Sequence, residues 1–365
     1  MSDTNLQHKD KTVKESFRFG DVLTRASSHS AFWPAVALVV MLIACGLRSP
    51  GFLDVTIMDG HLFGQLVDIA RNAVTPLLLA LGMALVIATG GIDLSVGAVM
   101  AISLAVSLTF IDSVPDGSSA GVAAIAVLLG LAVALVIGTF NGFLVSVLGI
   151  QPFIATMILM VAGRGIAMLL TRGQITTVTS PPFKAIGSGF ILGVPTPIVI
   201  AIGTFIIMTL LVRRTAFGMN LEALGINREA SRLAGVKSVS TIWIVYIVSG
   251  LMAGLAGIVY GAPTMAADAN NIGLMKEMDA IMVVVLGGTK LSGGRFSLGG
   301  TVVGALILAT LERAVIIFGF PSQTTPLFKA IVLIIICIAA SPIFQERQHA
   351  RRARKSSRAK PAAAV

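Results

Sequence analysis

Long apolar stretches separated by short polar breaks dominate this chain. The first runs from about 31 to 47, after a polar and basic segment at 1–30. Further apolar stretches follow at about 73–90, 94–111, 120–140, 151–171, 194–212, 241–263, 280–293, 298–318 and 327–344. Most of these approach the roughly 20 apolar residues with which an α-helix crosses a bilayer core. The pattern predicts a polytopic bundle of about ten transmembrane helices.

The alternative of a transmembrane β-barrel is disfavoured by the same pattern. Barrel strands give short segments of alternating polarity, whereas these stretches are almost continuously apolar. Composition agrees, since 55% of the 365 residues are hydrophobic, 12% are charged and the mean hydropathy is +0.92. We therefore expect an all-α integral membrane protein in which one transmembrane domain covers 31–344.

Basic residues indicate which segments face the cytoplasm. If the N-terminus lies in the cytoplasm and successive spans cross the membrane in alternating directions, the cytoplasmic segments include 1–30, the loop 213–240, the turn 287–297 and the tail 345–365. These segments carry most of the lysine and arginine, as the positive-inside rule expects. Both termini are therefore predicted to be cytoplasmic. The basic tail 345–365 is expected to be disordered and to contact anionic lipid headgroups.

Several kinds of site are excluded by the distribution of charge, cysteine and histidine. The net charge of +10 sits largely in the predicted cytoplasmic segments, so it indicates membrane topology and no nucleic-acid partner. Cys45 and Cys337 both fall inside apolar stretches and do not suggest a disulfide framework. The four histidines are scattered, and no metal site is expected because a zinc site needs several ligands to converge.

A pair of glycines and a carboxylate interrupt an apolar stretch at 90–97. Glycine lets the backbone unwind, and Asp93 or Ser95 can cap a helix that restarts near Leu94. Unwound backbone facing lipid would leave polar groups unsatisfied, so a broken helix in a transporter lines a cavity. Asp93 is thus either part of a gate in the translocation path or the N-cap after an ordinary turn. The sequence leaves both open.

A second Gly-Gly turn, at 287–296, raises the question of a phosphate-binding loop. A P-loop needs lysine directly after glycine, but here Thr289 precedes Lys290 and Leu291 follows it. We therefore expect no nucleotide site in this chain, so that a partner must handle any ATP. Both turns read Gly-Gly-x-x-Leu-Ser after an apolar span, which predicts a weak internal repeat of parallel spans.

One arginine lies inside a predicted span. Arg164 stands between two apolar runs, where a charge costs several kcal/mol unless it is paired or hydrated. It should face the bundle interior. It is interpreted either as a pore-lining donor to substrate hydroxyls or as the structural partner of a carboxylate such as Asp93 or Glu312.

The loop 213–240 contains a short amphipathic pattern from Gly218 to Val236. Leu221, Leu224 and Ile226 alternate there with polar and charged residues, which predicts a helix. Such a helix either docks into a groove of a cytoplasmic partner or lies on the membrane surface. Its carboxylates and interior glycines favour the docked arrangement.

This segment resembles the EAA-like coupling loop of ABC importer permeases, with Glu222-Ala223 and Gly225 in the motif positions. The runs that begin at Thr89, Asn141, Ile150 and Gly163 resemble those of the ribose, xylose and galactose importer permeases. Segments 150–174 and 266–274 look most similar to galactofuranose permeases. The resemblance covers nearly the whole hydrophobic body.

The resemblance implies an assembly in the bacterial inner membrane. A second permease copy or a related chain, cytoplasmic ATP-binding subunits beneath the coupling loops and a periplasmic sugar-binding protein are its expected partners. This chain would have no catalytic residue and bind no cofactor, while the partner uses ATP and Mg²⁺. The coupling loop would include Gly218, Glu222, Ala223, Gly225, Asn227 and Gly235. The candidates for the translocation path are Asp93, Ser95, Asn141, Gln151 and Arg164.

Two other functional classes are weighed against a sugar importer. An ion-coupled secondary sugar transporter would need a coupling-ion site, but Asp93 and Glu312 form no evident cluster in the sequence. An intramembrane enzyme would need a motif such as the His-Glu-x-x-His zinc motif, which does not occur. The expected function is passage of a monosaccharide such as galactofuranose or ribose, driven by ATP hydrolysis in the partner.

Overall fold

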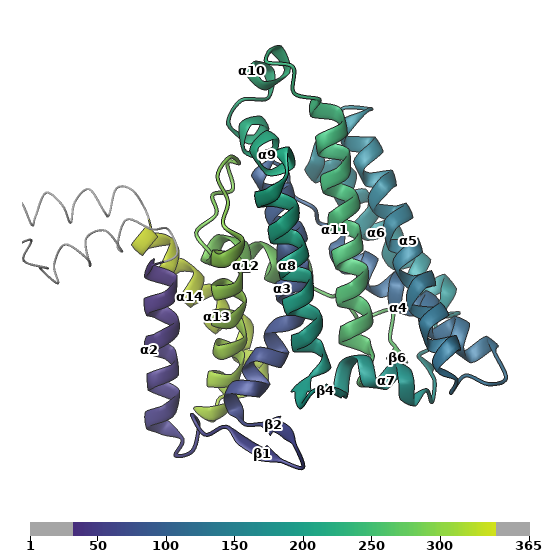
Figure 1. Ribbon diagram of the computed structural model, residues 1–365, viewed down its shortest axis with the longest axis vertical. Coiled ribbons are helices and arrows are strands. Elements are labelled where there is room, and N and C mark those ends of the chain that lie inside the picture. The colour runs from purple at the N-terminus through teal and green to yellow at the C-terminus, as the bar shows by residue number, and fades with distance from the viewer. Residues whose placement is uncertain (1–31, 341–365) are drawn as a thin grey trace, which may run out of the picture.

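The computed structural model describes residues 32–340 (Figure 1). The predictions for the tails at 1–30 and 345–365 therefore lie outside the described residues. The α-helices are α2 (Phe32–Arg48), α3 (Gln65–Ala88), α4 (Val96–Ser113), α5 (Ala120–Ser146), α6 (Pro152–Leu170), α7 (Pro181–Ser188), α8 (Thr196–Arg214), α9 (Ala216–Ile226), α10 (Arg228–Leu233), α11 (Ser238–Gly261), α12 (Lys276–Leu286), α13 (Leu298–Ile317) and α14 (Thr325–Ala340). A 3₁₀ turn, η1 (Ser322–Thr324), precedes α14.

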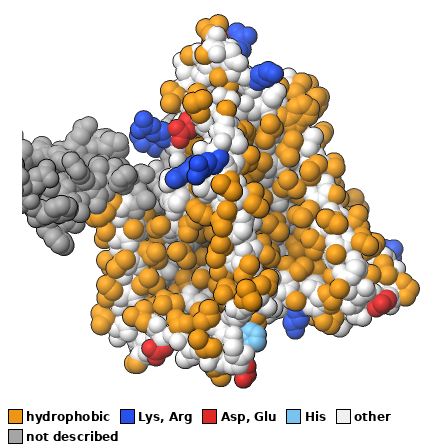
Figure 2. Space-filling model, in the orientation of Figure 1, with side chains coloured by type: hydrophobic (Ala, Val, Ile, Leu, Met, Phe, Trp, Pro, Cys, Tyr) orange, Lys and Arg blue, Asp and Glu red, His pale blue; other side chains and the backbone are white. Residues whose placement is uncertain are grey.

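Seven of these helices are long and apolar enough to cross a membrane: α3, α4, α5, α6, α8, α11 and α13. The helices α2, α12 and α14 are shorter, with 17, 11 and 16 residues. On the face in Figure 2, charged side chains gather toward the two ends, and mainly hydrophobic side chains lie between them. The chain is a polytopic helical membrane protein, while ten crossings and cytoplasmic termini stay predictions.

The expectation of a purely α-helical chain needs one correction, because three small antiparallel sheets are present. They pair β1 (Thr56–Met58) with β2 (His61–Phe63), β3 (Thr176–Thr177) with β6 (Ala266–Ala267) and β4 (Phe190–Ile191) with β5 (Val194–Pro195). Helix α7 and the labelled strands lie at one end of the bundle, and α9 and α10 lie at the other (Figure 1). We call these the hairpin end and the α9 end.

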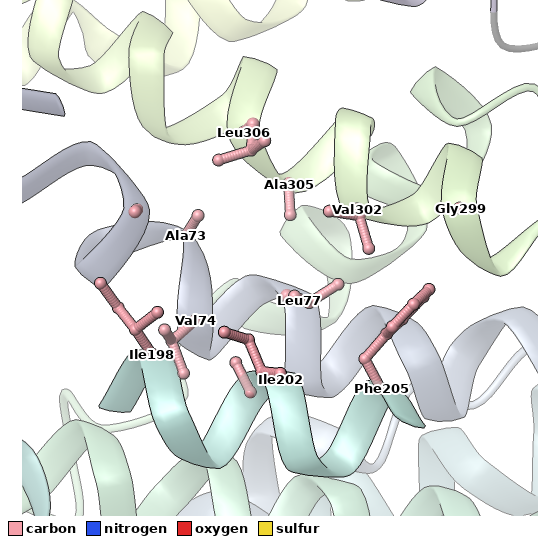
Figure 3. A pocket seen from close by; sticks show the side chains of 12 residues that line it. Ala73, Val74, Leu77, Ile198, Ile202, Phe205, Gly299, Val302, Ala305 and Leu306 are labelled. Carbon is pink, nitrogen blue, oxygen red and sulfur yellow. The ribbon is translucent and has the colours of Figure 1, made fainter. Parts of the chain in front are cut away.

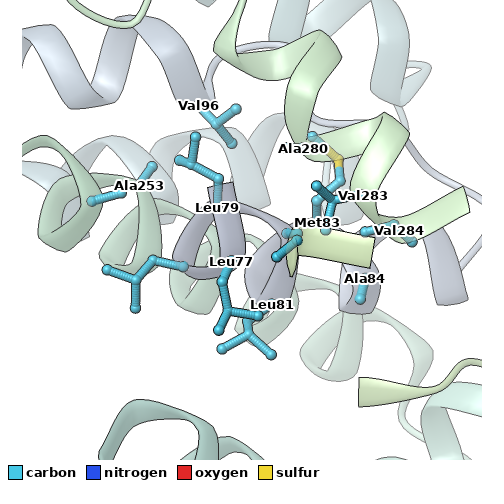
Figure 4. Close-up of a cluster of buried hydrophobic side chains, with 14 of the residues drawn as sticks. Leu77, Leu79, Leu81, Met83, Ala84, Val96, Ala253, Ala280, Val283 and Val284 are labelled. Atoms are coloured by element: carbon cyan, nitrogen blue, oxygen red, sulfur yellow. The ribbon is translucent and has the colours of Figure 1, made fainter. Parts of the chain in front are cut away.

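Helix α3 forms the centre of the bundle, because its second half is apolar all round. Every residue from Pro76 to Ala88 is buried, and α11, α12 and α13 pack around it (Figure 4). Small residues allow close approach between helices, as is usual in membranes, where packing rather than the hydrophobic effect drives association. Gly82 of α3 meets the backbone of Ser249, and Gly138 of α5 meets Gly250.

Two broken crossings meet inside the bundle. Helix α3 runs to the α9 end, where residues 89–95 turn back inward and α4 begins beside the middle of α11. Helix α11 runs to the hairpin end, where residues 262–275 return inward to the start of α12. The two returning segments touch at Gly97 and Gly273, leaving no room for a side chain at either glycine.

The two Gly-Gly turns of the predicted internal repeat lie together. Helices α3 and α12, which precede these turns, run in the same direction, and Gly294 donates a backbone hydrogen bond of 2.9 Å to Ala88. The parallel repeat itself stays a prediction.

Candidate functional site

Asp93 is the centre of a buried cluster of hydrogen bonds at the first break. Its Oδ1 accepts from the backbone N of Ser95 at 3.0 Å and from the Ser95 hydroxyl at 2.6 Å. Its Oδ2 accepts from the Ser249 hydroxyl at 2.7 Å, and Asn141 Nδ2 donates to Ser95 Oγ at 2.8 Å. The structure therefore brings together three of the predicted path residues: Asp93, Ser95 and Asn141. Their hydrogen bonds join α4, α5 and α11.

The unwound backbone beside Asp93 is also satisfied by side chains. Leu94 N donates to the hydroxyl of Thr156 on α6 at 3.1 Å, and this hydroxyl donates to Pro152 O at 2.8 Å. Asp93 is 2% exposed, and the hydroxyl of Tyr246 is buried nearby without a hydrogen-bond partner among the described residues. These hydrogen bonds tie the first break to α4, α5, α6 and α11, and the N-cap of α4 is Ser95. A gate role and a capping role for Asp93 both stay predictions.

Arg164 lies elsewhere and binds the second break. Its Nη1 donates to the backbone oxygens of Ala269, at 3.2 Å, and of Ile272. Asp93 and Glu312 are not its partners, because Asp93 binds serine groups and Glu312 binds Lys329. The carboxylate with which the charge of Arg164 interacts is Glu277. Arg164 supplies donors to carbonyl groups that the unwound segment 262–275 would otherwise leave unsatisfied.

Gln151 does not join either group of residues. It is exposed at the N-terminus of α6, next to Pro152, and its side chain makes no capping hydrogen bond. Of the five candidates for the translocation path, three form the cluster around Asp93, Arg164 binds the other break and Gln151 lies apart.

The predicted amphipathic helix is two helices in the structure. Helix α9 ends at Ile226 because Asn227 adopts an extended conformation, and its side chain accepts from Ala230 N at 3.0 Å as the N-cap of α10. Leu221 and Leu224 are buried as expected, whereas Ile226 is 73% exposed. The break at Asn227 turns Ile226 away from the bundle.

The glycines of this segment have different positions. Gly218 and Gly225 face inward, where a methyl group at Gly218 would overlap Val212 and one at Gly225 would overlap Ala88 and Gly294. Gly235 has φ +86°, a left-handed conformation that favours glycine, and it ends the turn after α10. Glu222 and Ala223 are half-buried, and Glu222 lines a polar cavity of about 300 Å³ with Arg213, Gly218 and Ser297.

The outer side of α9 and α10 is exposed and partly apolar. Met219, Ile226 and Leu233 are 71%, 73% and 79% exposed. Arg232 pairs with Glu229 at 2.8 Å, and this carboxylate raises the pKa of the arginine. A projecting surface that combines large apolar side chains with charges is typical of a protein contact.

A polar cavity of about 350 Å³ near the hairpin end was missed by the sequence reasoning. We call it the hairpin-end cavity; it lies between α3, α7, α11, α12 and α13. Its lining residues are Asp68, Arg71, Asn72, Thr75, Pro76, Gly187, Pro197, Val259, Tyr260, Pro263, Lys276 and Glu312. These side chains are spread over 245 positions from first to last, so no local motif marks them.

Ion pairs join the wall of this cavity to α14. Lys329 contacts Asp279 and Glu312, each at 2.8 Å, and Asp279 also pairs with Lys276 at 3.2 Å. These side chains are mostly buried, so each charge needs its partner. The network fixes the first turn of α12 against α13 and α14.

A second groove is apolar. Side chains of α3, α8 and α13, among them Leu77, Ile202, Phe205 and Leu306, line a space of about 340 Å³ (Figure 3). It contains almost no polar group, unlike the hairpin-end cavity. Within residues 32–340, no group of three or more histidine, cysteine or carboxylate side chains could hold a metal ion.

The apolar helices, the two broken crossings and the projecting α9–α10 segment define the class of protein: a multi-pass helical membrane protein. The chain belongs to the family described as branched-chain amino acid transport system / permease component, whose model matches residues 65–339. No solved structure matches the chain significantly.

Curated relatives cover most of the chain. A galactofuranose transporter permease protein of Escherichia coli is 47% identical, over 86% of this chain and 91% of its own. A fructose import permease protein of Bifidobacterium longum is 42% identical, over 86% and 88%. A ribose import permease protein of Bacillus subtilis is 34% identical, over 83% and 90%. The expected resemblance to sugar importer permeases is confirmed.

Proposed function

We propose that this chain is the permease subunit of a bacterial ABC importer and forms the path of a monosaccharide across the inner membrane. The names of its relatives support a sugar, since they specify galactofuranose, fructose and ribose. ATP and Mg²⁺ would be used by a separate ATP-binding subunit, and this chain would be non-catalytic. A periplasmic sugar-binding protein and a second permease copy or paralogue complete the proposed assembly.

The observation that carries the proposal is the contact of α9 with the first break. Gly225 packs against Ala88, the last residue of α3, and against Gly294 of the second Gly-Gly turn. The outer side of α9 and α10 is free to contact a partner, with Met219, Ile226 and Leu233 exposed. A force on α9 is thus transmitted directly to the backbone that leads into Asp93.

The proposed mechanism follows from this contact. Closure of the ATP-binding subunits moves α9, which displaces the end of α3 and the turn 287–297. The broken crossings then rearrange, and the bundle alternates between states open to either side. The Asp93 cluster is the part that must open or move as a unit, because its hydrogen bonds tie α4, α5 and α11 together.

The test combines purification and transport. The chain is purified with the products of neighbouring genes and reconstituted in liposomes, where ATP hydrolysis and the uptake of D-galactose, D-fructose and D-ribose are measured with and without the binding protein. Sugar uptake that requires ATP supports the proposal. Uptake driven by an ion gradient without any ATPase partner would replace it with secondary transport.

A variant pair tests the coupling segment. Glu222→Lys reverses a charge beside the exposed surface of α9. We expect this variant complex to hydrolyse ATP, but the sugar-loaded binding protein should no longer stimulate the hydrolysis. Lys237→Gln, on an exposed residue before α11, is the control. Normal uptake and stimulation in Glu222→Lys would contradict the role of this segment.

A further inference from the structure

The hairpin-end cavity has the size and the chemistry of a small-molecule site. Its volume of about 350 Å³ lies near the lower end of the range for such sites, about 300 to 1,000 Å³. Asn72 and Tyr260 are both exposed in its wall, and their polar groups make no hydrogen bond to other described residues. These groups are available to a ligand.

The wall combines hydrogen-bonding side chains with apolar surfaces. Tyr260 is 43% exposed, with the Lys276 ammonium 5.7 Å from the centroid of its ring, and Pro76, Val259 and Pro263 add apolar area. Asp68, Arg71, Asn72 and Thr75 face the same space from α3. A sugar has the matching pattern, since its hydroxyl groups need donors and acceptors while its C–H faces pack on aromatic rings.

The charges of the wall favour a neutral ligand. Two acidic and two basic side chains line it, and each has a partner outside the cavity or in its wall. Lys276 pairs with Asp279, Glu312 with Lys329, and Asp68 lies 3.9 Å from Arg313. Arg71 donates to Gly187 O at 3.0 Å. Three of these four charges are therefore compensated by an opposite charge, while Arg71 has a neutral carbonyl as its partner. Uncharged hydroxyl groups can use the remaining hydrogen-bonding capacity of the wall.

We infer that the hairpin-end cavity binds one monosaccharide before it enters the bundle, with Asn72 and Tyr260 contacting the sugar. This inference rests on the proposed function and adds a recognition site within the permease itself. The cavity reaches Lys276, the first residue of α12, next to Met275 with its left-handed φ of 61°. A bound sugar therefore touches the start of the second broken crossing.

The experiment measures uptake in liposomes containing the complete importer. Asn72→Leu and Tyr260→Leu are compared with the unsubstituted chain for D-galactose, D-fructose and D-ribose at limiting concentration. A net hydrogen bond contributes about 1 kcal/mol, so we expect uptake to fall about fivefold for each variant, with unequal losses among the sugars. Gln174→Leu removes an exposed amide at the same end, outside the cavity, and serves as the control.

The readouts separate this inference from the proposed function. Basal ATP hydrolysis should be unchanged in Gln174→Leu, and Tyr260→Phe should retain more uptake than Tyr260→Leu because it keeps the ring. Equal uptake and an unchanged order of preference in Asn72→Leu and Tyr260→Leu would overturn the cavity as a sugar site while leaving the importer intact. Failure of the unsubstituted chain to transport any of the three sugars would overturn both.

Competition tests the class of ligand. Excess L-leucine should leave labelled sugar uptake unchanged, because Lys276, Asp68 and Glu312 are already paired and Arg71 alone cannot hold both charges of a zwitterion. If L-leucine inhibits sugar uptake by the unsubstituted chain but not by the Asn72→Leu variant, the cavity would instead be assigned to an amino acid.

Discussion

Gly225 of α9 lies directly against the carbonyl oxygen of Ala88, the residue at which α3 ends. The contact leaves no space for a methyl group, and Gly294 closes the same space from the turn 287–297 with its hydrogen bond to Ala88. Three segments that are far apart in sequence therefore meet backbone to backbone. Their proximity gives α9 a mechanical connection to the first break that needs no long side chain.

Gly225→Ala should separate α9 from α3. The methyl group forces the backbones apart, so we expect at least a tenfold loss of ATP-driven uptake, corresponding to about 1.4 kcal/mol at the coupled step. Gly203→Ala on α8 is the matched control, because a methyl group there meets nothing within 4 Å. Equal uptake by the two variants would show that the contact does not transmit motion.

Ser249→Ala should loosen the buried cluster. It removes one hydrogen bond to the carboxyl group of Asp93, and bonds to charged groups contribute about 1.5 to 3 kcal/mol. We expect a lower midpoint of thermal unfolding in detergent micelles. Ser240→Ala, on an exposed residue of the same helix, should leave the midpoint within error. If both variants melt alike, Asp93 does not depend on α11.

Arg164→Gln should free the second returning segment. The guanidinium group binds two backbone oxygens from this segment, and glutamine is too short to replace it. Amide hydrogen exchange of residues 268–275 is expected to accelerate, while exchange in α5 stays unchanged. Protection of 268–275 equal to that of the unsubstituted chain would rule out this anchoring role.

Lys329→Met should leave two carboxylates without their shared partner. Removing one member of a buried ion pair costs about 3 to 5 kcal/mol, and Asp279 and Glu312 both contact this ammonium group. We expect a lower unfolding midpoint, with partial recovery in the double variant Lys329→Met/Glu312→Gln, because Asp279 keeps Lys276 as a partner. Recovery of the unfolding midpoint in the double variant is the decisive measurement. If only packing were lost, the destabilising effects of the two substitutions would add.

The sequence could predict most of the helical crossings, because apolar length is itself the physical requirement for spanning a membrane. Asp93 with Ser95 could be found as well, since glycine pairs and a capping carboxylate are adjacent in the chain. Its partner Ser249 could not, being 156 residues away and one hydroxyl among many. The break between α9 and α10 did have a local signal in Asn227, a preferred N-cap residue.

The hairpin-end cavity illustrates the remaining limit. Asp68 and Lys276 precede the apolar stretches 73–90 and 280–293, and Glu312 lies inside the stretch 298–318, so nothing in the sequence relates the three charges to one another. Only the return of residues 262–275 into the bundle brings α12 beside α3 and α13. A site that forms because a chain segment folds back into the bundle depends on tertiary contacts. The hydrophobic periodicity of the sequence does not predict such contacts.

The meeting of Gly97 and Gly273 also has an electrostatic consequence. It sets the amino-terminal ends of α4 and α12 side by side within the bundle, and each end carries partial positive charge from its aligned peptide dipoles. A carboxylate accompanies each end, Asp93 at α4 and Glu277 in the first turn of α12. In their ionised forms the two carboxylates offset the partial positive charge of the helix ends beside them. The meeting point of the two broken crossings thus places opposite charges next to each other inside the bundle.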